Sequence, residues 1–353
     1  MATAARALLR NPTSKIVLAL SSIIISLVIV EVALRGLGYQ PRRPPTNNQL
    51  QTWASQHAEM GWINRPGTSH SMEAGRVAMH FEPDGRRSDP AGNKPESLPR
   101  VLVVGCSYTQ GYGIADEQTY SHLINESLPS AELLNYGTGG YGSYQSLLRI
   151  RSYFKSPHAK TPLVIYGLFH GHPARDVAPL AWILSLTTQD GRYLVPPNVR
   201  QERSGRFAEN PGGPIDIWPL EQQTAIVALL HQVVVNRAPR RVTPAMADAV
   251  FRHLIVEMNT TVADNNAALL VIGLTAMPDW AASWMREHGV DFVPCHHPDF
   301  GKDPALQVGA VGHPNERVHR WWAACALKAL AERGHAAAAE PNELQTTRNE
   351  TTP

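Results

Sequence analysis

Hydrophobic residues along the chain follow two patterns that indicate different environments. Near the N-terminus, the run IVLALSSIIISLVIVEVAL (16–34) holds 19 residues with a single charged side chain. From residue 100 onward, short apolar runs alternate with stretches in which apolar residues recur at helical spacing. The first pattern is typical of a helix that crosses a bilayer, and the second of a parallel sheet covered by helices.

The N-terminal run predicts one membrane span, because a helix of this length comes close to crossing a hydrocarbon core of about 30 Å. A cleaved signal peptide is the competing interpretation, but the run is long for such a segment and no small-x-small cleavage site follows it. Basic residues flank the run almost evenly, so the positive-inside rule leaves the orientation open. We expect Glu31, near the end of the run, to be an isolated carboxylate at the interface; a partner helix is the alternative.

The second pattern predicts an α/β domain with a mainly parallel sheet and helices on both faces. Strands are expected at 101–104, 132–136, 162–169, 268–274 and 291–294, and helices at 116–128, 143–154, 221–236, 244–264, 279–288 and 315–332. The segment 177–220 is rich in proline, glycine and charge, and breaks this alternation. We expect it to be a large surface excursion that forms a lid or a rim of the site.

These patterns divide the chain into five parts. They are an N-terminal segment (1–14), a transmembrane anchor (15–37), a linker with an N-terminal extension (38–99), the α/β domain (100–333) and a disordered tail (334–353). The linker is rich in proline and asparagine, which suits a spacer between a bilayer and a folded domain.

Composition excludes several classes of function. With 32 basic and 30 acidic residues the net charge is only +2, which argues against nucleic-acid binding. The three cysteines are too few and too scattered to predict a disulfide framework or a zinc site, and they leave the compartment open. We expect no cofactor and no metal.

Glycine-rich and histidine-containing segments follow three predicted strands and precede the last helix. They read GCSYTQG (105–111), NYGTGGYG (135–142), FHGHP (169–173) and VGHPN (311–315). In an open parallel sheet the carboxyl ends of the strands meet along one edge, where loops form a crevice. Ser107 has the position of a nucleophile, and His313 that of a general base.

These segments resemble the motif blocks of the SGNH or GDSL-type serine hydrolases, in particular the bacterial members with one N-terminal span. The likeness covers about residues 15–40 and 60–332. The family's Gly-Asp-Ser-x-Thr-x-Gly matches GCSYTQG, except that Cys106 replaces the aspartate. The resemblance implies a three-layer, flavodoxin-like α/β/α domain with Ser107 as the nucleophile and His313 as the base.

The resemblance also implies an oxyanion hole. Its donors are the amides of Ser107 and Gly140, with Gly137 as the other glycine candidate. His172 stands where the family has an asparagine, and an imidazole still offers an N–H donor.

The triad acid is missing from its usual place. Ala310 and Val311 stand where the family has the aspartate of Asp-x-x-His. Loss of the group that orients a catalytic histidine can cost about 10⁴-fold in rate. Asp299, Asp303 or a backbone carbonyl could orient His313 instead. Alternatively, Ser107 and His313 work as a dyad without an orienting group.

The reaction implied by the resemblance is acyl-ester hydrolysis, such as deacetylation of a glycan or a small ester. The domain is expected in the periplasm, anchored to the bacterial inner membrane with its N-terminus in the cytoplasm. O-acyl transfer to a cell-surface polysaccharide is the alternative, in which proteins of polysaccharide assembly are candidate partners. A degenerate domain that only binds glycan or a protein is the non-enzymatic alternative.

Other interpretations of single residues compete with this assignment. Cys106 is an alternative nucleophile, although its place beside the strand favours a small buried filler. His170 and His172 could meet the Cys295-His296-His297 segment at a metal, although their spacing fits no compact ligand motif. Arg175 and Asp176 are candidates for the pocket lining or for a surface ion pair.

Overall fold

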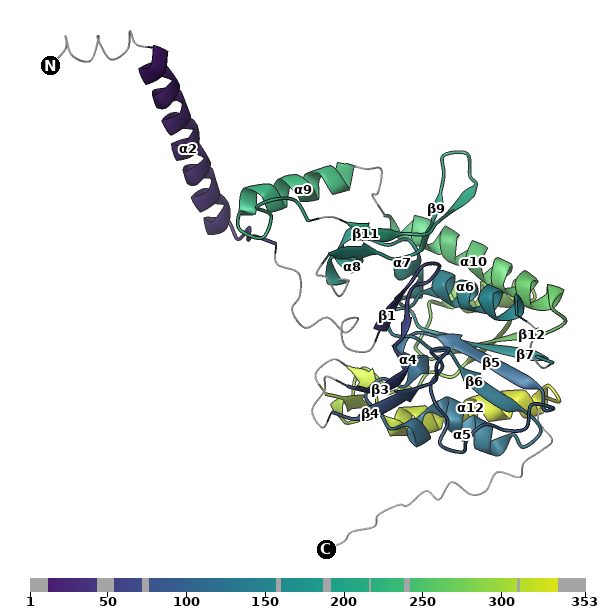
Figure 1. Cartoon of the computed structure of the whole chain (residues 1–353). Helices are drawn as coiled ribbons and strands as arrows, with labels where there is room; N and C mark the ends of the chain where they lie inside the picture. Colours follow the sequence, from purple (N-terminus) through teal and green to yellow (C-terminus); the bar gives the residue numbers. More distant parts are fainter. Residues whose placement is uncertain are drawn as a thin grey trace, which may run out of the picture.

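The computed structural model in Figure 1 describes residues 12–42, 54–71, 76–156, 160–186, 192–215, 217–237, 242–309 and 312–335. The predicted N-terminal segment 1–14 and the predicted tail 334–353 lie almost entirely outside these residues. Ala310 and Val311, at the expected place of the triad acid, lie outside them too.

Five parallel strands form the central sheet, in the order β13-β12-β7-β5-β6. They are β5 (Arg100–Gly105), β6 (Glu132–Asn135), β7 (Leu163–Leu168), β12 (Ala268–Gly273) and β13 (Asp291–Pro294). In the middle of the sheet, Val103 of β5 lies opposite Asn135 on one side and Ile165 on the other. The α/β prediction is confirmed, because strands buried on both faces leave continuous apolar runs that a sequence displays clearly.

Helices cover both faces of the sheet (Figure 1). On one face lie α6 (Ser143–Phe154), α10 (Pro244–Asp264) and α11 (Asp279–Glu287), and on the other α5 (Tyr120–Ser127) and α12 (Glu316–Glu332). Alternate residues of β5 point to opposite faces of the sheet. Leu102 and Val104 pack with the first group of helices, and Val101 and Val103 pack with the second. The helix expected at 116–128 is interrupted, since a 3₁₀ turn η1 (Asp116–Gln118) precedes α5.

Two antiparallel hairpins precede the sheet. They are β1 (Ala54–His57) with β2 (Gly61–Asn64), and β3 (Gly67–His70) with β4 (Ala78–Phe81). Trp62 and Phe81 from these hairpins share a buried cluster with Tyr112 and Tyr141 of the main domain. The N-terminal extension is therefore part of the folded core.

The segment 177–220 is more ordered than the sequence indicated. It follows α7 (His172–Asp176) and holds α8 (Leu180–Ser185), β8 (Tyr193–Val195), β9 (Asn198–Gln201), β10 (Phe207–Asn210) and β11 (Gly213–Ile215). β8 pairs with β11 and β9 with β10, both antiparallel. Ile183 and Tyr193 form part of a small buried cluster here. Strands of three or four residues are too short to show a reliable alternation, so the sequence did not predict these elements.

The helix α2 (Pro12–Gly36) is long and apolar enough to cross a membrane by length and composition, and none of its residues is buried. Its C-terminal end meets α9 (Ala225–Arg237) (Figure 1).

The C-terminal part of the domain is cross-linked. Cys295, which follows β13, forms a disulfide with Cys325 of α12. Between them lie η2 (Pro304–Leu306), β14 (Gln307–Val308) and β15 (His313–Pro314). The sequence did not predict this single disulfide, because 29 intervening residues hide a proximity that only the packing of α12 against the sheet creates.

Candidate active site

Ser107 lies where strand β5, next to the central strand β7, turns into the short helix α4 (Ser107–Gln110). The turn is tight: a Cβ on Gly105 would clash with Thr109 and lie 2.9 Å from the carbonyl oxygen of Gly167. Only glycine lets the chain fold back this closely beside β7. The resulting Ser107 is 6% exposed, at the carboxyl edge of the sheet.

His313 meets Ser107 from the other end of the domain. Its Nε2 lies 3.0 Å from the Ser107 Oγ, although the two residues are 206 positions apart. The backbone of His313 pairs with Val308 in the β14–β15 ladder. Its ring packs against Tyr112, with centroids 4.8 Å apart, and against Tyr108 at 5.7 Å. The structure therefore brings together the two side chains that the sequence named as nucleophile and base.

The imidazole of His313 is neutral at pH 7. Burial, with the positive charge of Arg175 as a second cause, lowers its pKa to about 4. A neutral Nε2 can accept the hydroxyl proton of Ser107, but a pKa this low makes a weak base.

The Nδ1 atom of His313 is buried, and no hydrogen-bond partner for it lies among the described residues. Asp299 is exposed, and Asp303 instead caps η2 by accepting from the N–H of Ala305 at 2.9 Å. Neither carboxylate forms an ion pair with His313 in the described part of the chain. No contact to His313 among the described residues supports an orienting role for Asp299 or Asp303, and these roles remain predictions.

The two glycine candidates for the oxyanion hole differ in their amides. The N–H of Gly137 donates to Asn135 Oδ1 at 2.9 Å, whereas that of Gly140 has no acceptor among the described residues. Gly140 also has φ +80°, and a Cβ there would lie 3.1 Å from the indole of Trp62. The amide that is free for a ligand is therefore that of Gly140.

His172 is fully buried at the start of α7. Its Nδ1 lies 2.6 Å from the Tyr166 hydroxyl, and its Nε2 has no partner in the described chain. Burial and the charge of Arg175 lower its pKa well below the ordinary value, so the ring is neutral. Donation from Nε2 to an oxyanion requires that Nδ1 accept the proton of Tyr166, whereas in this structure the Tyr166 hydroxyl donates to Ser143 Oγ at 2.9 Å. No hydrogen bond among the described residues joins His172 to Ser107, and its role stays a prediction.

Arg175 and Asp176 form no surface ion pair. The guanidinium of Arg175 stacks on Phe169 and Trp182 and donates to the carbonyl oxygen of Tyr141 at 3.0 Å. No carboxylate lies within 4 Å of it among the described residues. Asp176 is buried and accepts from the Tyr144 N–H at the start of α6, and burial raises its pKa to about 7. The sequence offered no signal for the stacked cation.

Side chains of the β1–β2 hairpin hold the glycine-rich loop. The indole of Trp62 donates to the carbonyl oxygen of Gly139 at 2.9 Å, and Asn64 Nδ2 donates to that of Gly137 at 2.9 Å. Asn64 Oδ1 in turn accepts from Gln110 of α4 at 2.7 Å. Asn64 therefore links the turn that carries Ser107 to the loop that carries the free Gly140 amide. The stretch GWIN was visible in the sequence, but nothing in it indicated this partner.

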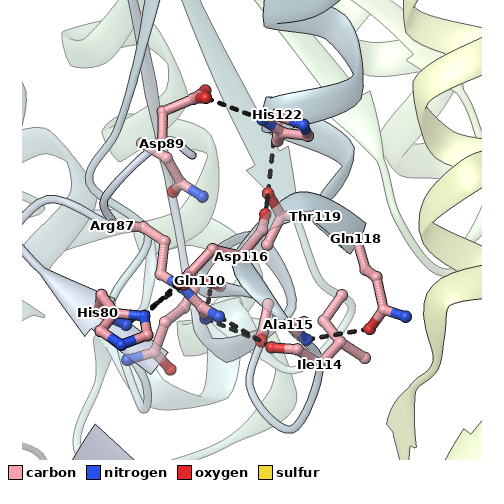
Figure 2. A network of polar contacts seen from close by, with 12 residues as sticks. His80, Arg87, Asp89, Gln110, Ile114, Ala115, Asp116, Gln118, Thr119 and His122 are labelled. Carbon is pink, nitrogen blue, oxygen red and sulfur yellow. Dashed lines mark hydrogen bonds and ion pairs between the residues drawn. The ribbon is translucent and has the colours of Figure 1, made fainter. Parts of the chain in front are cut away.

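A buried ion pair holds the loop that follows α4. Figure 2 shows Arg87 reaching across this loop to Asp116, which also contacts His80. The same guanidinium donates to the carbonyl oxygens of Gln110, Gly111 and Ile114 at 2.8–3.0 Å. The loop that carries Tyr112 to the ring of His313 is thereby fixed.

Two competing assignments find no geometric support. Cys106 is buried with 0% exposure and forms no hydrogen bond as a cap of α4. Cys295 is in the disulfide, and no group of three potential metal ligands occurs among the described residues.

No family model matches the sequence, and no curated protein matches it. Among similar solved structures, a member of the lipolytic G-D-S-L family from Veillonella parvula DSM 2008 is 12% identical with a TM-score of 0.37, the match covering 66% of this chain and 99% of that chain. The SGNH-hydrolase family esterase AlinE4 is 15% identical with a TM-score of 0.35, over 68% and 98% of the two chains.

A salicylyl-acyltransferase from a tetracycline biosynthetic pathway is 12% identical with a TM-score of 0.36, over 69% of this chain and 57% of that chain. At such scores nothing about activity follows from these matches. The chain itself has a mainly parallel α/β fold, with the serine after β5 and the histidine on β15.

Proposed function

We propose that the protein is an acyl-ester enzyme in which Ser107 is the nucleophile and His313 the base. The observation that carries this proposal is the 3.0 Å hydrogen bond between Ser107 Oγ and His313 Nε2 at the carboxyl edge of the sheet. The free amide of Gly140 supports it, because an acyl carbonyl attacked at Ser107 needs donors for its developing negative charge.

The reaction proceeds in two halves. Ser107 Oγ forms a bond to the acyl carbon while its proton moves to His313 Nε2, and the N–H groups of Ser107 and Gly140 stabilise the oxyanion. His313 then protonates the leaving alcohol, and the C–O bond breaks to leave an acyl-serine. Water, deprotonated by His313, releases the acyl group and restores the serine.

The substrate that we propose is an acetylated glycan or small ester. The indoles of Trp62 and Trp182 lie against Gly140, which leaves little room beside the oxyanion donor and favours a small acyl group.

We propose that α2 anchors the protein in the bacterial inner membrane with the domain in the periplasm. The Cys295–Cys325 disulfide supports this location, because such bonds persist in oxidising compartments.

The test is hydrolysis of p-nitrophenyl acetate by the full chain in detergent, with labelling by a fluorophosphonate. We expect Ser107→Ala to abolish hydrolysis and labelling, and Cys106→Ser to retain hydrolysis and labelling. Loss of labelling in Cys106→Ser alone would identify the cysteine as the nucleophile. Acyl transfer to an added glycan that outruns hydrolysis would assign the same site to an O-acyltransferase.

The unpartnered Nδ1 of His313 favours one further candidate, a domain that binds an acylated glycan without turnover. It predicts saturable glycan binding that Ser107→Ala leaves unchanged, with no fluorophosphonate labelling of the unmodified protein.

A further inference from the structure

The helix α9 is fastened to the C-terminal end of α2. Glu31 accepts hydrogen bonds from the N–H groups of Ala225 at 2.8 Å and Ile226 at 3.1 Å, which are the first residues of α9. Arg35, itself paired with Glu31, donates to the carbonyl oxygen of Gln223 at 2.9 Å. The expectation of an isolated carboxylate at Glu31 was therefore wrong. Figure 1 shows α9 running crosswise to α2, on the side of the domain nearest to it.

Two polar residues of α9, His231 and Gln232, point into the protein. His231 is buried, with its Nδ1 2.6 Å from a Glu221 carboxylate oxygen, and Gln232 accepts from Arg42 at 3.2 Å. The opposite face carries Leu230 and Val234, which are 52% and 51% exposed. A helix on the surface of a protein in water has the reverse arrangement, with apolar residues inside and polar residues outside.

Further apolar side chains are exposed beside this face. Leu37 and Tyr39 follow α2 directly, and Trp218 and Leu220 precede α9 by a few residues; all four are among the exposed large hydrophobic residues. Since Glu31 ties the end of α2 to the start of α9, these segments belong to one end of the molecule. Tyrosine and tryptophan are the residues enriched where a bilayer meets water.

The position of α9 along α2 fits the same environment. Glu31 lies five residues before the end of α2 at Gly36, or about 8 Å along the helix axis. Helices that lie in the plane of a bilayer insert their apolar face about 5–10 Å into the boundary between headgroups and acyl chains.

We infer that α9 is an interfacial helix whose Leu230–Val234 face lies in the lipid bilayer that α2 crosses. The inference rests on the proposed anchor. Together the two helices attach the domain to the membrane at two points, so that the domain has a fixed orientation rather than swinging on a single tether. The partner is the lipid surface itself, because α9 begins at Glu31 of the exposed apolar helix α2 and exposes apolar side chains of its own.

The test is spin-label depth in vesicles of phosphatidylethanolamine and phosphatidylglycerol that hold the full chain. Single cysteines are placed at Leu230→Cys, at Val234→Cys on the same face, and at Val256→Cys on α10 as the matched control, which is 41% exposed. The native Cys106 is buried and the other two cysteines are paired, so only the new thiol is labelled. We expect the ratio of oxygen to water-soluble nickel-chelate collisions to be several-fold higher at Leu230 and Val234 than at Val256.

A label at Ile23→Cys separates the two proposals. If Ile23 lies in lipid while Leu230 and Val234 are as accessible to the nickel chelate as Val256, the anchor stands and the inference about α9 is wrong. If Ile23 is itself accessible to the chelate, the anchor fails and the inference fails with it.

Discussion

The two halves of the candidate site are held in different ways. Ser107 belongs to a dense network: Asn64 joins its helix to the glycine loop, and Arg87 ties the following loop to Asp116. His313 is held by backbone pairing with Val308 and by aromatic packing, and its Nδ1 has no partner in the described chain. The position of Ser107 is thus fixed by many hydrogen bonds around it, whereas the position of His313 depends on a few contacts.

This difference indicates where activity can be lost or gained. Changes on the serine side should damage folding and geometry together, because each side chain there satisfies several buried groups. Changes near the histidine should alter its basicity while leaving the fold intact.

The largest expected effect is on the serine side, from Arg87→Met. It leaves Asp116 without its buried cation and the backbone carbonyls of Gln110 and Ile114 without a donor. We expect the free energy of unfolding to fall by about 3–5 kcal/mol, measured by denaturant titration in detergent. Arg86→Met, next in the chain but paired at the surface, should cost less than about 1 kcal/mol. Equal losses would mean that the buried pair does not hold this loop.

The base side should gain from Ala310→Asp, which restores the Asp-x-x-His spacing. A carboxylate beside Nδ1–H would raise the pKa of His313 from about 4 and orient its ring. We expect kcat/KM to rise roughly 10- to 100-fold, a part of the ~10⁴-fold contribution of such a group. Because the base works only when neutral, the acidic limb of the pH–rate profile should move to higher pH. Ala310→Asn is the uncharged control, and an equal effect from it would rule out the charge.

Asn64→Ala tests the link between the serine turn and the glycine loop. It removes the donor to Gly137 and the acceptor for Gln110, both buried. We expect a loss of about 1–3 kcal/mol in stability and a lower kcat with little change in KM. The exposed Asn93 serves as the control through Asn93→Ala. Unchanged kcat would show that the hairpin is not needed to position Gly140.

The smallest effect is expected from Arg175→Met. The charge of Arg175 is the second cause, after burial, of the low pKa of His313. Its removal should raise that pKa and move the acidic limb to higher pH, by less than Ala310→Asp does. Arg175→Lys keeps a positive charge, and its profile should stay close to that of the unmodified protein. A shift of equal size in both variants would assign the effect to lost stacking on Phe169 and Trp182.

The sequence predicted the central sheet well for a physical reason. Strands such as β5 and β7 are buried on both faces, so nearly every residue is apolar and the run stands out. The Ser107–His313 pair was found through motif resemblance, because the carboxyl edge of the sheet collects loops from distant parts of the chain.

Features that depend on tertiary packing were missed. The stacking of Arg175 joins Phe169 to Trp182, and the bond from Asn64 to Gly137 joins segments 73 residues apart. Neither contact has a local pattern that hydrophobic periodicity can report. The hairpins within 177–220 were missed because strands of three or four residues carry too little alternation.

The disulfide places a chemical condition on the base half alone. His313 lies within the covalent ring closed by Cys295 and Cys325, whereas Ser107 lies outside it. Closing the ring reduces the conformations open to the histidine loop. Reduction of the disulfide is therefore expected to loosen the histidine loop more than the serine turn.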